Sequence, residues 1–327
     1  MRIAILGAGA FGTALAVHLN RLSHEPVIWT RSASKAAQIP AGSNHDALPG
    51  VGFEPGLLVV TDVGRALDEA DLAVLATPSL AIREALLAVH EERPGLRVVS
   101  VAKGIDPKTL QLHWQIAAEV APRSPFCALT GPSFAREVLS GQPTALVAAS
   151  KDAALAQAVQ NTFSGPRLRV YESDDVQGAE MAGALKNVIA IAAGMVAGLK
   201  CGENTRAALI TRGLAEITRL AVASGGRAET VAGLAGLGDL VLTCSSNQSR
   251  NFQFGRLVAE GKEPSEVLHS LGTVEGLRTT SAACLLGERL GVETPIAREV
   301  RGVLVQGVSP QDAVAALMLR RLKREVH

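Results

Sequence analysis

Short apolar runs alternate with segments of helical spacing over the first half of the chain. These runs predict eight buried strands, at Ile3–Leu6, Val27–Thr30, Leu57–Thr61, Leu72–Ala76, Arg97–Ala102, Cys127–Thr130, Ala145–Ala148 and Leu168–Tyr171. Segments with the periodicity of an amphipathic helix, such as Ala81–His90 and Ala153–Thr162, separate many of the runs. Strands that alternate with helices are typical of a doubly wound, parallel α/β sheet.

The pattern changes after Asp175. From Val176 onward the chain shows helical periodicity with glycine punctuation and no alternating strand pattern, which predicts an all-α region. Because 327 residues exceed the size at which one core usually keeps growing, we expect an α/β domain over residues 1–178 and a helical domain over residues 179–327. The basic residues at the end of the chain, 320–327, are expected to complement the dipole of a helix end.

The first predicted strand ends in a glycine-rich turn. Gly7, Gly9 and Gly12 form a G-x-G-x-x-G pattern between this strand and a helical segment that is expected from Thr13. Glycine permits the tight turn and lets the backbone approach phosphates, while the helix N-terminus offers unpaired amides and a positive dipole end. This order predicts a Rossmann-type site for a nicotinamide or flavin dinucleotide, and a plain strand–turn–helix joint is the alternative.

Arg31 follows the second predicted strand, at the position where NAD-binding sites usually carry an acidic residue. A guanidinium pairs with the 2'-phosphate of NADP, whereas a carboxylate would repel it. We therefore expect the site to accept NADP, without deciding between NADP and NAD. A solvated loop arginine is the alternative interpretation.

Composition excludes several classes of protein. A net charge of +1 gives no reason to expect a nucleic-acid or anionic-membrane surface, and 3% aromatic residues argue against a base-stacking platform. The four cysteines, Cys127, Cys201, Cys244 and Cys284, lie far apart without a C-x-x-C pair, which indicates reduced thiols of a cytoplasmic protein and no metal site. The apolar stretch Val188–Leu199 is short and rich in glycine, and the chain starts directly with a strand, so we expect neither membrane insertion nor a signal peptide.

A nucleotide domain followed by a helical domain places the expected site in the cleft at the carboxyl ends of the strands. Lys103 follows the fifth predicted strand, where it faces either a phosphate or carbonyl oxygen of a ligand or simply the solvent. Gly131-Pro132-Ser133 ends the sixth strand and opens a helix, so its amides are placed to meet an anion. An ordinary helix cap by Ser133 is the alternative.

Lys186 is the most conspicuous anomaly of the sequence. Together with Asn187 it interrupts a long run of small and apolar residues, 180–199, which has helical character. Burial disfavours a charged lysine and lowers its pKa towards the range of a general acid, so we predict that Lys186 is catalytic. A lysine that snorkels at a helix edge is the alternative. Glu180 lies about two turns earlier and would pair with Lys186 only through an intermediate group.

A further polar segment starts at Asp239, which follows three glycines. Ser249, Arg250 and Asn251 come next in a polar loop, a combination suited to a sugar-like hydroxyl on the carboxylate and a phosphate on the guanidinium and amide donors. A capped helix followed by a polar loop is the equally simple alternative.

Six segments in this order, GAGAFGTALA, SVAKGID, TGPSFARE, MAGALKNVIAIAAGMVAGL, GLAGLGDLVLTC and SRNFQFG, span nearly the whole chain. The series resembles NAD(P)-dependent glycerol-3-phosphate dehydrogenase of the bacterial type. The resemblance implies reversible hydride transfer between a nicotinamide and C2 of dihydroxyacetone phosphate, which gives sn-glycerol 3-phosphate for phospholipid synthesis. It also implies that Lys186 donates or accepts the proton at the C2 oxygen, and no metal is required.

The resemblance assigns further residues to two groups. Those expected to contact substrate are Lys103, Gly131, Ser133, Lys186, Asp239, Thr243, Ser249, Arg250 and Asn251. Those expected to line the cofactor are Gly7, Gly9, Ala10, Phe11, Gly12, Arg31, Lys103, Ala135, Arg250 and Glu275. The chain departs from the family pattern at Phe11, where Trp or Tyr is frequent, so packing on the cofactor is kept while a polar contact of that ring is lost.

Two other functions remain open from the sequence. A dehydrogenase of the same two-domain plan acting on another small hydroxy acid would need a carboxylate clamp, and the Arg250-Asn251 segment argues mildly against it. A non-catalytic NAD(P)H sensor would need neither Lys186 on an apolar helix nor a pocket around Asp239. The oligomeric state is also left open, a homodimer included.

Overall fold

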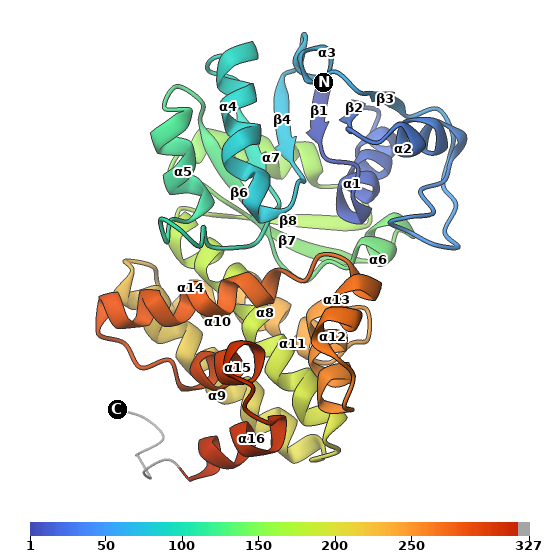
Figure 1. The fold of residues 1–327 in the computed structure, drawn as a ribbon. Helices are drawn as coiled ribbons and strands as arrows, with labels where there is room; N and C mark the ends of the chain where they lie inside the picture. The colour runs from blue at the N-terminus through green and yellow to red at the C-terminus, as the bar shows by residue number, and fades with distance from the viewer. Residues whose placement is uncertain (320–327) are drawn as a thin grey trace.

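The structure is a computed structural model and describes residues 1–319 (Figure 1). The basic terminal residues, 320–327, for which a helix end is predicted, lie outside the described residues. The strands are β1 (Arg2–Leu6), β2 (Glu25–Trp29), β3 (Leu58–Val60), β4 (Leu72–Leu75), β5 (Val98–Ser100), β6 (Phe126–Thr130), β7 (Thr144–Ala149) and β8 (Leu168–Ser173). All eight predicted strands are therefore confirmed, with ends that differ by up to two residues.

The helices fall into two sets along the chain. The first set consists of α1 (Ala10–Arg21), α2 (Ala33–Gln38), η1 (Ile39–Ala41), α3 (Val63–Leu67), η2 (Ser79–Ala81), α4 (Ile82–Glu92), α5 (His113–Val120), α6 (Ala135–Leu139) and α7 (Ala153–Phe163). The second set consists of α8 (Val176–Gly198), α9 (Glu203–Ala223), α10 (Ala228–Ala232), η3 (Leu234–Gly238), α11 (Asp239–Cys244), α12 (Arg250–Ala259), α13 (Pro264–Leu271), α14 (Glu275–Leu290), α15 (Pro295–Gln306) and α16 (Pro310–Met318). Among the described residues, the chain after β8 thus forms helices and no strand, as predicted.

One eight-stranded sheet carries the first half of the chain, in the order β3-β2-β1-β4-β5-β6-β7-β8. The strands from β3 to β6 are parallel, so their carboxyl ends meet at one edge, and the strand order reverses between β1 and β4. The prediction of a parallel sheet fails at one pairing, because β7 lies antiparallel to β6. Only the short helix α6 connects these two strands, and it does not return the chain to the start of a parallel strand.

Both faces of the sheet are covered, which explains the unbroken apolar runs of the central strands. In β1, Ile3 and Ile5 belong to a core cluster with α1 and α7. Ala4 and Leu6 of the same strand belong to the opposite cluster, with α3, α4 and α5. Successive side chains of a strand point to opposite faces, so each face receives every second residue.

Helix α8 is the axis of the helical region, and the other helices of that region surround it in Figure 1. By its length and composition alone, α8 could span a membrane. In the structure, however, 89% of its most apolar segment is buried inside the protein, so α8 is a core helix. Glycines allow α8 and α12 to pack closely together. A Cβ at Gly194 of α8 would lie 2.0 Å from the carbonyl oxygen of Phe252, and one at Gly255 of α12 would lie 2.0 Å from that of Ile191.

The two regions meet where β8 leads into α8. Asp175 caps this helix, with Oδ1 accepting a hydrogen bond from the amide of Gly178 at 2.8 Å. The predicted domain boundary, 178/179, falls within the first turn of α8. In Figure 1 the strands β7 and β8 border the helical region, with α8 starting beneath them.

Candidate active site

The glycine-rich turn after β1 has the conformation that a dinucleotide site requires. Gly7 adopts a φ of 126°, and a Cβ at this position would lie 2.6 Å from the carbonyl oxygen of Ala76. A Cβ at Gly12 would lie 2.1 Å from the carbonyl oxygen of Gly7. A Cβ at Gly9, by contrast, would meet no atom within 4 Å, so this glycine leaves open space beside the turn.

The helix that follows this turn has a free N-terminus. Helix α1 begins at Ala10, not at the predicted Thr13, because the amide of Thr13 already donates a helical hydrogen bond to the carbonyl oxygen of Gly9 at 3.0 Å. Gly9 is the N-cap and supplies no side-chain hydrogen bond, so the first amides point to the open space. These features fit a dinucleotide pyrophosphate at the N-terminus of α1.

Other residues predicted for the cofactor lie at three places around the sheet edge. Ala10, Phe11 and Ala135 are half-buried and pack on the core cluster beneath α1. Arg31 is exposed beyond β2 and forms no hydrogen bond or ion pair with any residue of the described range 1–319. Glu275 is the first residue of α14, and its Oε1 accepts a hydrogen bond from the amide of Ser79 at 3.1 Å.

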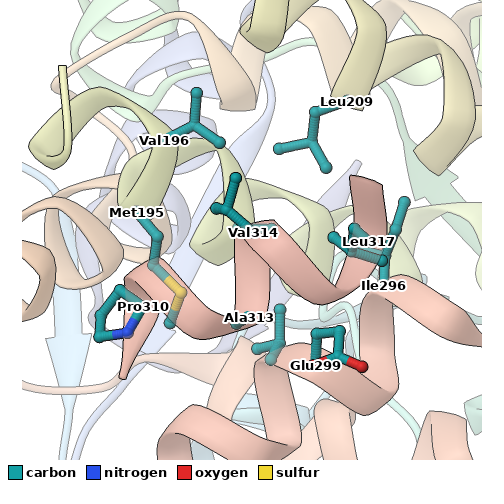
Figure 2. A pocket seen from close by; sticks show the side chains of 11 residues that line it. Met195, Val196, Leu209, Ile296, Glu299, Pro310, Ala313, Val314 and Leu317 are labelled. Carbon is teal, nitrogen blue, oxygen red and sulfur yellow. The ribbon is translucent and has the colours of Figure 1, made fainter. Parts of the chain in front are cut away.

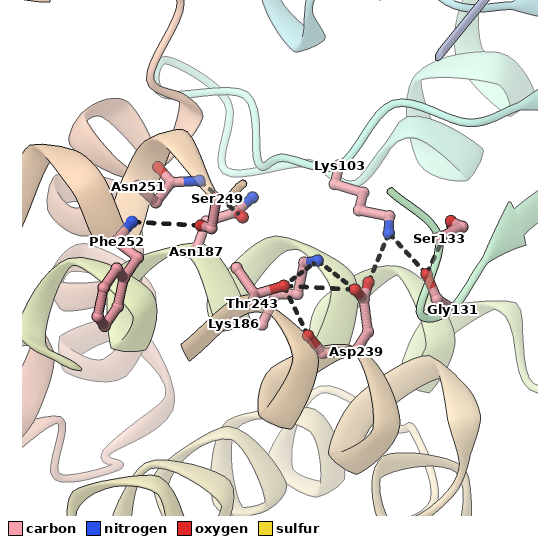
Figure 3. Close-up of polar contacts among 10 residues, drawn as sticks. All are labelled: Lys103, Gly131, Ser133, Lys186, Asn187, Asp239, Thr243, Ser249, Asn251 and Phe252. Atoms are coloured by element: carbon pink, nitrogen blue, oxygen red, sulfur yellow. Dashed lines mark hydrogen bonds and ion pairs between the residues drawn. The ribbon is translucent and has the colours of Figure 1, made fainter. Parts of the chain in front are cut away.

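Lys103, Lys186 and Asp239 form an ionic cluster between the two regions, in which Lys186 and Asp239 are buried and Lys103 is half-buried (Figure 3). Lys186 of α8 donates to Oδ1 of Asp239 and, at 2.7 Å, to Oγ1 of Thr243. Lys103, from the loop after β5, donates to Oδ2 of the same carboxylate at 2.5 Å and to the carbonyl oxygen of Gly131 at 3.2 Å. One carboxylate therefore bridges two lysines, and the ionised trio carries a net charge of +1.

Burial and charge act in opposite directions on these groups. Lys186 is 7% exposed, and its burial lowers the pKa of the ammonium to about 8, although the charge of Asp239 works to raise it. Burial would raise the pKa of the Asp239 carboxyl, but the charges of Lys103 and Lys186 outweigh this effect and lower it. Asp239 is consequently an anion at neutral pH, held between two cationic donors.

Local backbone features bring these side chains together. Asp239 follows a π-helical turn, η3, which packs so tightly that a Cβ at Gly236 would lie 2.0 Å from the carbonyl oxygen of Val231. Gly183, one turn before Lys186, faces the same site: a Cβ there would lie 3.2 Å from Oγ1 of Thr130 and 3.6 Å from Cγ of Lys103. The tight η3 turn thus directly precedes the carboxylate that the two lysines share.

The loop after β6 closes the same site. Gly131 has a φ of 133°, which favours glycine, and its carbonyl oxygen accepts hydrogen bonds from Lys103 and, at 3.1 Å, from Oγ of Ser133. Ser133 does not cap the next helix, whose N-cap is Phe134, so the alternative of a Ser133 cap is wrong. The solvated-loop alternative for Lys103 and the snorkelling alternative for Lys186 are likewise contradicted by the cluster.

A second polar group lies beside the cluster in Figure 3. Asn251 donates from Nδ2 to Oδ1 of Asn187 at 2.9 Å, and its own Oδ1 accepts from the amide of Gly276 at 2.9 Å. Ser249 is the N-cap of α12 and accepts from the amide of Phe252 at 3.2 Å, as the capped-helix alternative expects. Burial lowers the pKa of the Arg250 guanidinium, while the charge of Glu275 works to raise it.

Sequence reasoning missed Asn187 as a member of the site. It follows Lys186 directly in the apolar run and is 6% exposed, so the same anomaly of a polar residue in that run identifies it. Ser79, whose amide bonds Glu275, carried no comparable signal, because it interrupts no pattern in the sequence. This contact depends on how the two regions pack together.

An apolar cavity lies apart from the ionic cluster. A small apolar cavity of about 20 Å³, between α8, α9, α15 and α16, is lined by residues such as Met195, Leu209 and Val314 (Figure 2). None of the residues lining it belongs to the polar site. Within residues 1–319, no group of three or more His, Cys, Asp or Glu side chains is placed to hold a metal ion.

Comparison with known proteins covers the whole chain. The model of the NAD-dependent glycerol-3-phosphate dehydrogenase N-terminus matches residues 2–156, and that of the C-terminus matches residues 175–315. The glycerol-3-phosphate dehydrogenase [NAD(P)+] of Acidobacterium capsulatum is 48% identical, over 98% of each chain. The crystal structure of a glycerol-3-phosphate dehydrogenase from Coxiella burnetii has a TM-score of 0.93 and 38% identity, and covers 97% of this chain and 98% of that one.

A more distant structure shares the fold alone. A ketopantoate reductase from Ralstonia eutropha has a TM-score of 0.62 at 18% identity, and covers 96% of this chain and all of that one. The two-domain plan is therefore not specific to one substrate. The full-length identity to the curated relatives is specific, and the chain belongs to the NAD-dependent glycerol-3-phosphate dehydrogenase family.

Proposed function

We propose that this chain reversibly reduces dihydroxyacetone phosphate to sn-glycerol 3-phosphate with NAD(P)H, and so feeds glycerophospholipid synthesis. Membership of the family, with relatives named for this activity, supports the reaction. The observation that carries the mechanism is the buried Lys186 ammonium, hydrogen-bonded to Asp239 and Thr243 at the seam between the two regions. A lysine with a lowered pKa is suited to proton transfer at a carbonyl oxygen.

The cofactor side is built on the turn after β1. Gly7, Gly9 and Gly12, with the free N-terminus of α1, would hold the pyrophosphate, and Arg31 would face a 2'-phosphate. Phe11 and Ala135 would pack against the cofactor. When bound, the nicotinamide supplies the hydride for reduction of the ketone.

Lys186 would act at the C2 oxygen of the substrate. As that oxygen gains negative charge, the ammonium stabilises the charge and delivers a proton, and in the reverse direction the neutral amine accepts it. Asp239 and Thr243 fix the direction of the lysine side chain, since each forms a hydrogen bond with Nζ. Lys103 shares the Asp239 carboxylate, so the pair leaves excess positive charge next to the reacting centre.

An anionic substrate suits this balance of charge. Ser249, Arg250 and Asn251 stand at the start of α12 and would receive the phosphate on hydroxyl, guanidinium and amide donors. Ser249 and Asn251 lie beside the cluster in Figure 3. Gly131 and Ser133 would line the opposite side, on the loop that Lys103 contacts. Phosphate binding remote from C2 provides interaction energy that orients the ketone.

The two alternatives have less support. A dehydrogenase for another small hydroxy acid shares the fold, but the likeness to a ketopantoate reductase is only 18% in identity. A non-catalytic sensor does not account for two lysines placed on one buried carboxylate. The observations therefore favour catalysis on a phosphorylated ketone.

The proposal also covers the cell compartment, the domain boundary and the assembly of the protein. We place the enzyme in the cytoplasm, because Cys127, Cys244 and Cys284 are buried free thiols, as a reducing compartment maintains them. We place the division between cofactor and substrate domains at 178/179, where α8 begins its passage through the helical core. A homodimer is the assembly we propose to look for first, by light scattering.

Initial rates of NADPH and NADH oxidation test the proposal. Dihydroxyacetone phosphate should support turnover with at least one of the two cofactors, and unphosphorylated dihydroxyacetone should be a far poorer substrate. Comparable rates with both ketones would contradict a phosphate site. Cofactor binding without oxidation in the presence of dihydroxyacetone phosphate would favour the sensor.

A further inference from the structure

Ser79 occupies a junction of four chain segments near the ionic cluster. It is the first residue of η2, directly after the loop that follows β4, and is 9% exposed. Its amide donates to Oε1 of Glu275 at 3.1 Å, and its Oγ lies 3.0 Å from Nε2 of His113 in α5. One residue thus joins the α/β domain to the start of α14.

Gly104, which follows Lys103, lies directly against this serine. A Cβ at Gly104 would lie 2.1 Å from Oγ of Ser79 and 2.7 Å from its Cβ, far inside contact distance. No positive φ is involved at this glycine, so the requirement for a missing side chain comes from Ser79 alone. The serine therefore determines how closely the loop that carries Lys103 approaches η2.

His113 lies on the other side of Ser79, with its Nε2 within hydrogen-bond distance of the serine Oγ. Its ring is 1% exposed, and the backbone of Ala102, the residue before Lys103, works to raise its pKa. Burial lowers the pKa of this ring to about 4 and raises that of the nearby Glu180 carboxyl to about 8, so both are neutral at pH 7. Their approach of 3.8 Å is accordingly a packing contact of neutral groups and not an ion pair. Glu180 instead accepts from the amide of Trp114 at 3.0 Å.

The loop also has an anchor beyond Gly104. Ile105 is 2% exposed and belongs to the core cluster of the helical region, while Ala102 packs on the core of the α/β domain. Residues 102–105 therefore form a loop that passes from the α/β domain to the helical region, and Lys103 extends from this loop to Asp239. A small shift of the loop would move Nζ of Lys103 away from the carboxylate.

We propose that Ser79 is a positioning residue, which with His113 sets the place of Lys103 by contact with Gly104. This inference rests on the proposed function, in which Lys103 contacts the substrate. Ser79 also bonds Glu275, which is predicted to line the cofactor, so a single residue would fix a substrate-side lysine and a cofactor-side carboxylate relative to each other. The amide bond to Glu275 survives any side-chain substitution at Ser79 that keeps the backbone in place.

A steric double-mutant cycle tests the contact. Gly104→Ala should raise KM for dihydroxyacetone phosphate and lower kcat/KM by about 10- to 100-fold, since displacement of a positioning group by about 1 Å has effects of this order. Ser79→Gly should lower kcat/KM by less, about threefold to tenfold. The double variant Ser79→Gly/Gly104→Ala should recover at least about fivefold over Gly104→Ala, because the added methyl then has room.

Matched measurements separate positioning from folding. Gly302→Ala in α15 is the control, because the nearest atoms to a Cβ there belong to Val308 and Gln306, at 3.4 Å or more. The dissociation constant of NADPH should stay within about threefold of wild type in every variant. If Gly104→Ala does not fold, Ser79→Ala is used instead, and it should raise KM for dihydroxyacetone phosphate at an unchanged melting temperature.

The outcomes are distinct. Gly104→Ala with wild-type kcat/KM, or a double variant no better than the product of the single effects, would overturn the positioning role of Ser79. So would Ser79→Ala with an unchanged KM. Failure of the wild-type protein to reduce dihydroxyacetone phosphate would instead contradict the proposed function, which the same assay measures first.

Discussion

Lys103 and Asp239 join the α/β domain to the helical region, with Nζ of the lysine 2.5 Å from Oδ2 of the carboxylate. They are 136 residues apart in sequence, and the other carboxylate oxygen accepts from Lys186. The carboxylate of Asp239 pairs with both lysines and so offsets the repulsion between their ammonium groups. Loss of that negative charge would leave the buried Lys186 and the half-buried Lys103 without compensation.

Asp239→Asn should therefore lower kcat/KM for dihydroxyacetone phosphate by at least about 100-fold, as expected for a lost electrostatic group of an active site. Because the charge of Asp239 raises the pKa of Lys186, its removal should also move the alkaline limb of the reductive pH profile to lower pH. Asp68→Asn, an exposed position at the end of α3, is the matched control. An unchanged pH profile in Asp239→Asn would show that the carboxylate does not control the lysine.

The lowered pKa of Lys186, about 8, sets a pH dependence of opposite sign in the two directions. Ketone reduction needs the protonated ammonium, so its kcat/KM should fall as pH rises through about 8. Oxidation of glycerol 3-phosphate needs the neutral amine, so its kcat/KM should rise over the same range. Profiles measured in both directions test this, and parallel curves in the two directions would contradict proton transfer by this group.

Arg31→Asp should weaken NADPH binding relative to NADH, because a carboxylate repels the 2'-phosphate and accepts from the 2'-hydroxyl. The exposed position of Arg31 beyond β2 makes a folding effect of the substitution small. Fluorescence titration with both cofactors gives the ratio of the two dissociation constants, with Arg123→Asp, also exposed, as the control. A ratio that does not move would place the cofactor preference elsewhere.

Asn251→Ala should weaken apparent binding of dihydroxyacetone phosphate by about 1–3 kcal/mol, through loss of an amide donor to the phosphate. The low activity on unphosphorylated dihydroxyacetone should be almost unchanged, since that ketone does not use the donor. The comparison matters here because Asn251 also bonds Asn187 and the amide of Gly276. An equal loss for both ketones would assign Asn251 to support of the site and move the phosphate towards Lys103 and Ser133.

The fold was largely predictable because burial leaves a local pattern. Strands such as β1 and β4 are covered on both faces, so they appear as unbroken apolar runs. The direction of β7 was not predictable in this way. An apolar run has the same pattern in either direction, and only the short connection through α6 decides it.

The candidate site was predictable where a residue conflicts with its surroundings. Lys186 is a lysine in an apolar helix, and the structure buries it at 7% exposure. Asn187 breaks the same apolar run, but it was not assigned to the site. The contacts of Ser79 had no such signal, because its partner Glu275 is 196 residues away and neither residue breaks a pattern. Pairings of this kind depend on how two domains dock, which local periodicity does not encode.

The central claim is that Lys186 transfers the proton at the C2 oxygen, and Lys186→Ala tests it most directly. Single-turnover oxidation of bound NADPH by dihydroxyacetone phosphate should slow by about 10²- to 10⁴-fold, the range for a lost acid–base group. The dissociation constant of NADPH should remain within about twofold, and Lys200→Ala, an exposed lysine just after the same helix, should behave as wild type. A Lys186→Ala variant that retains the wild-type single-turnover rate would contradict the account.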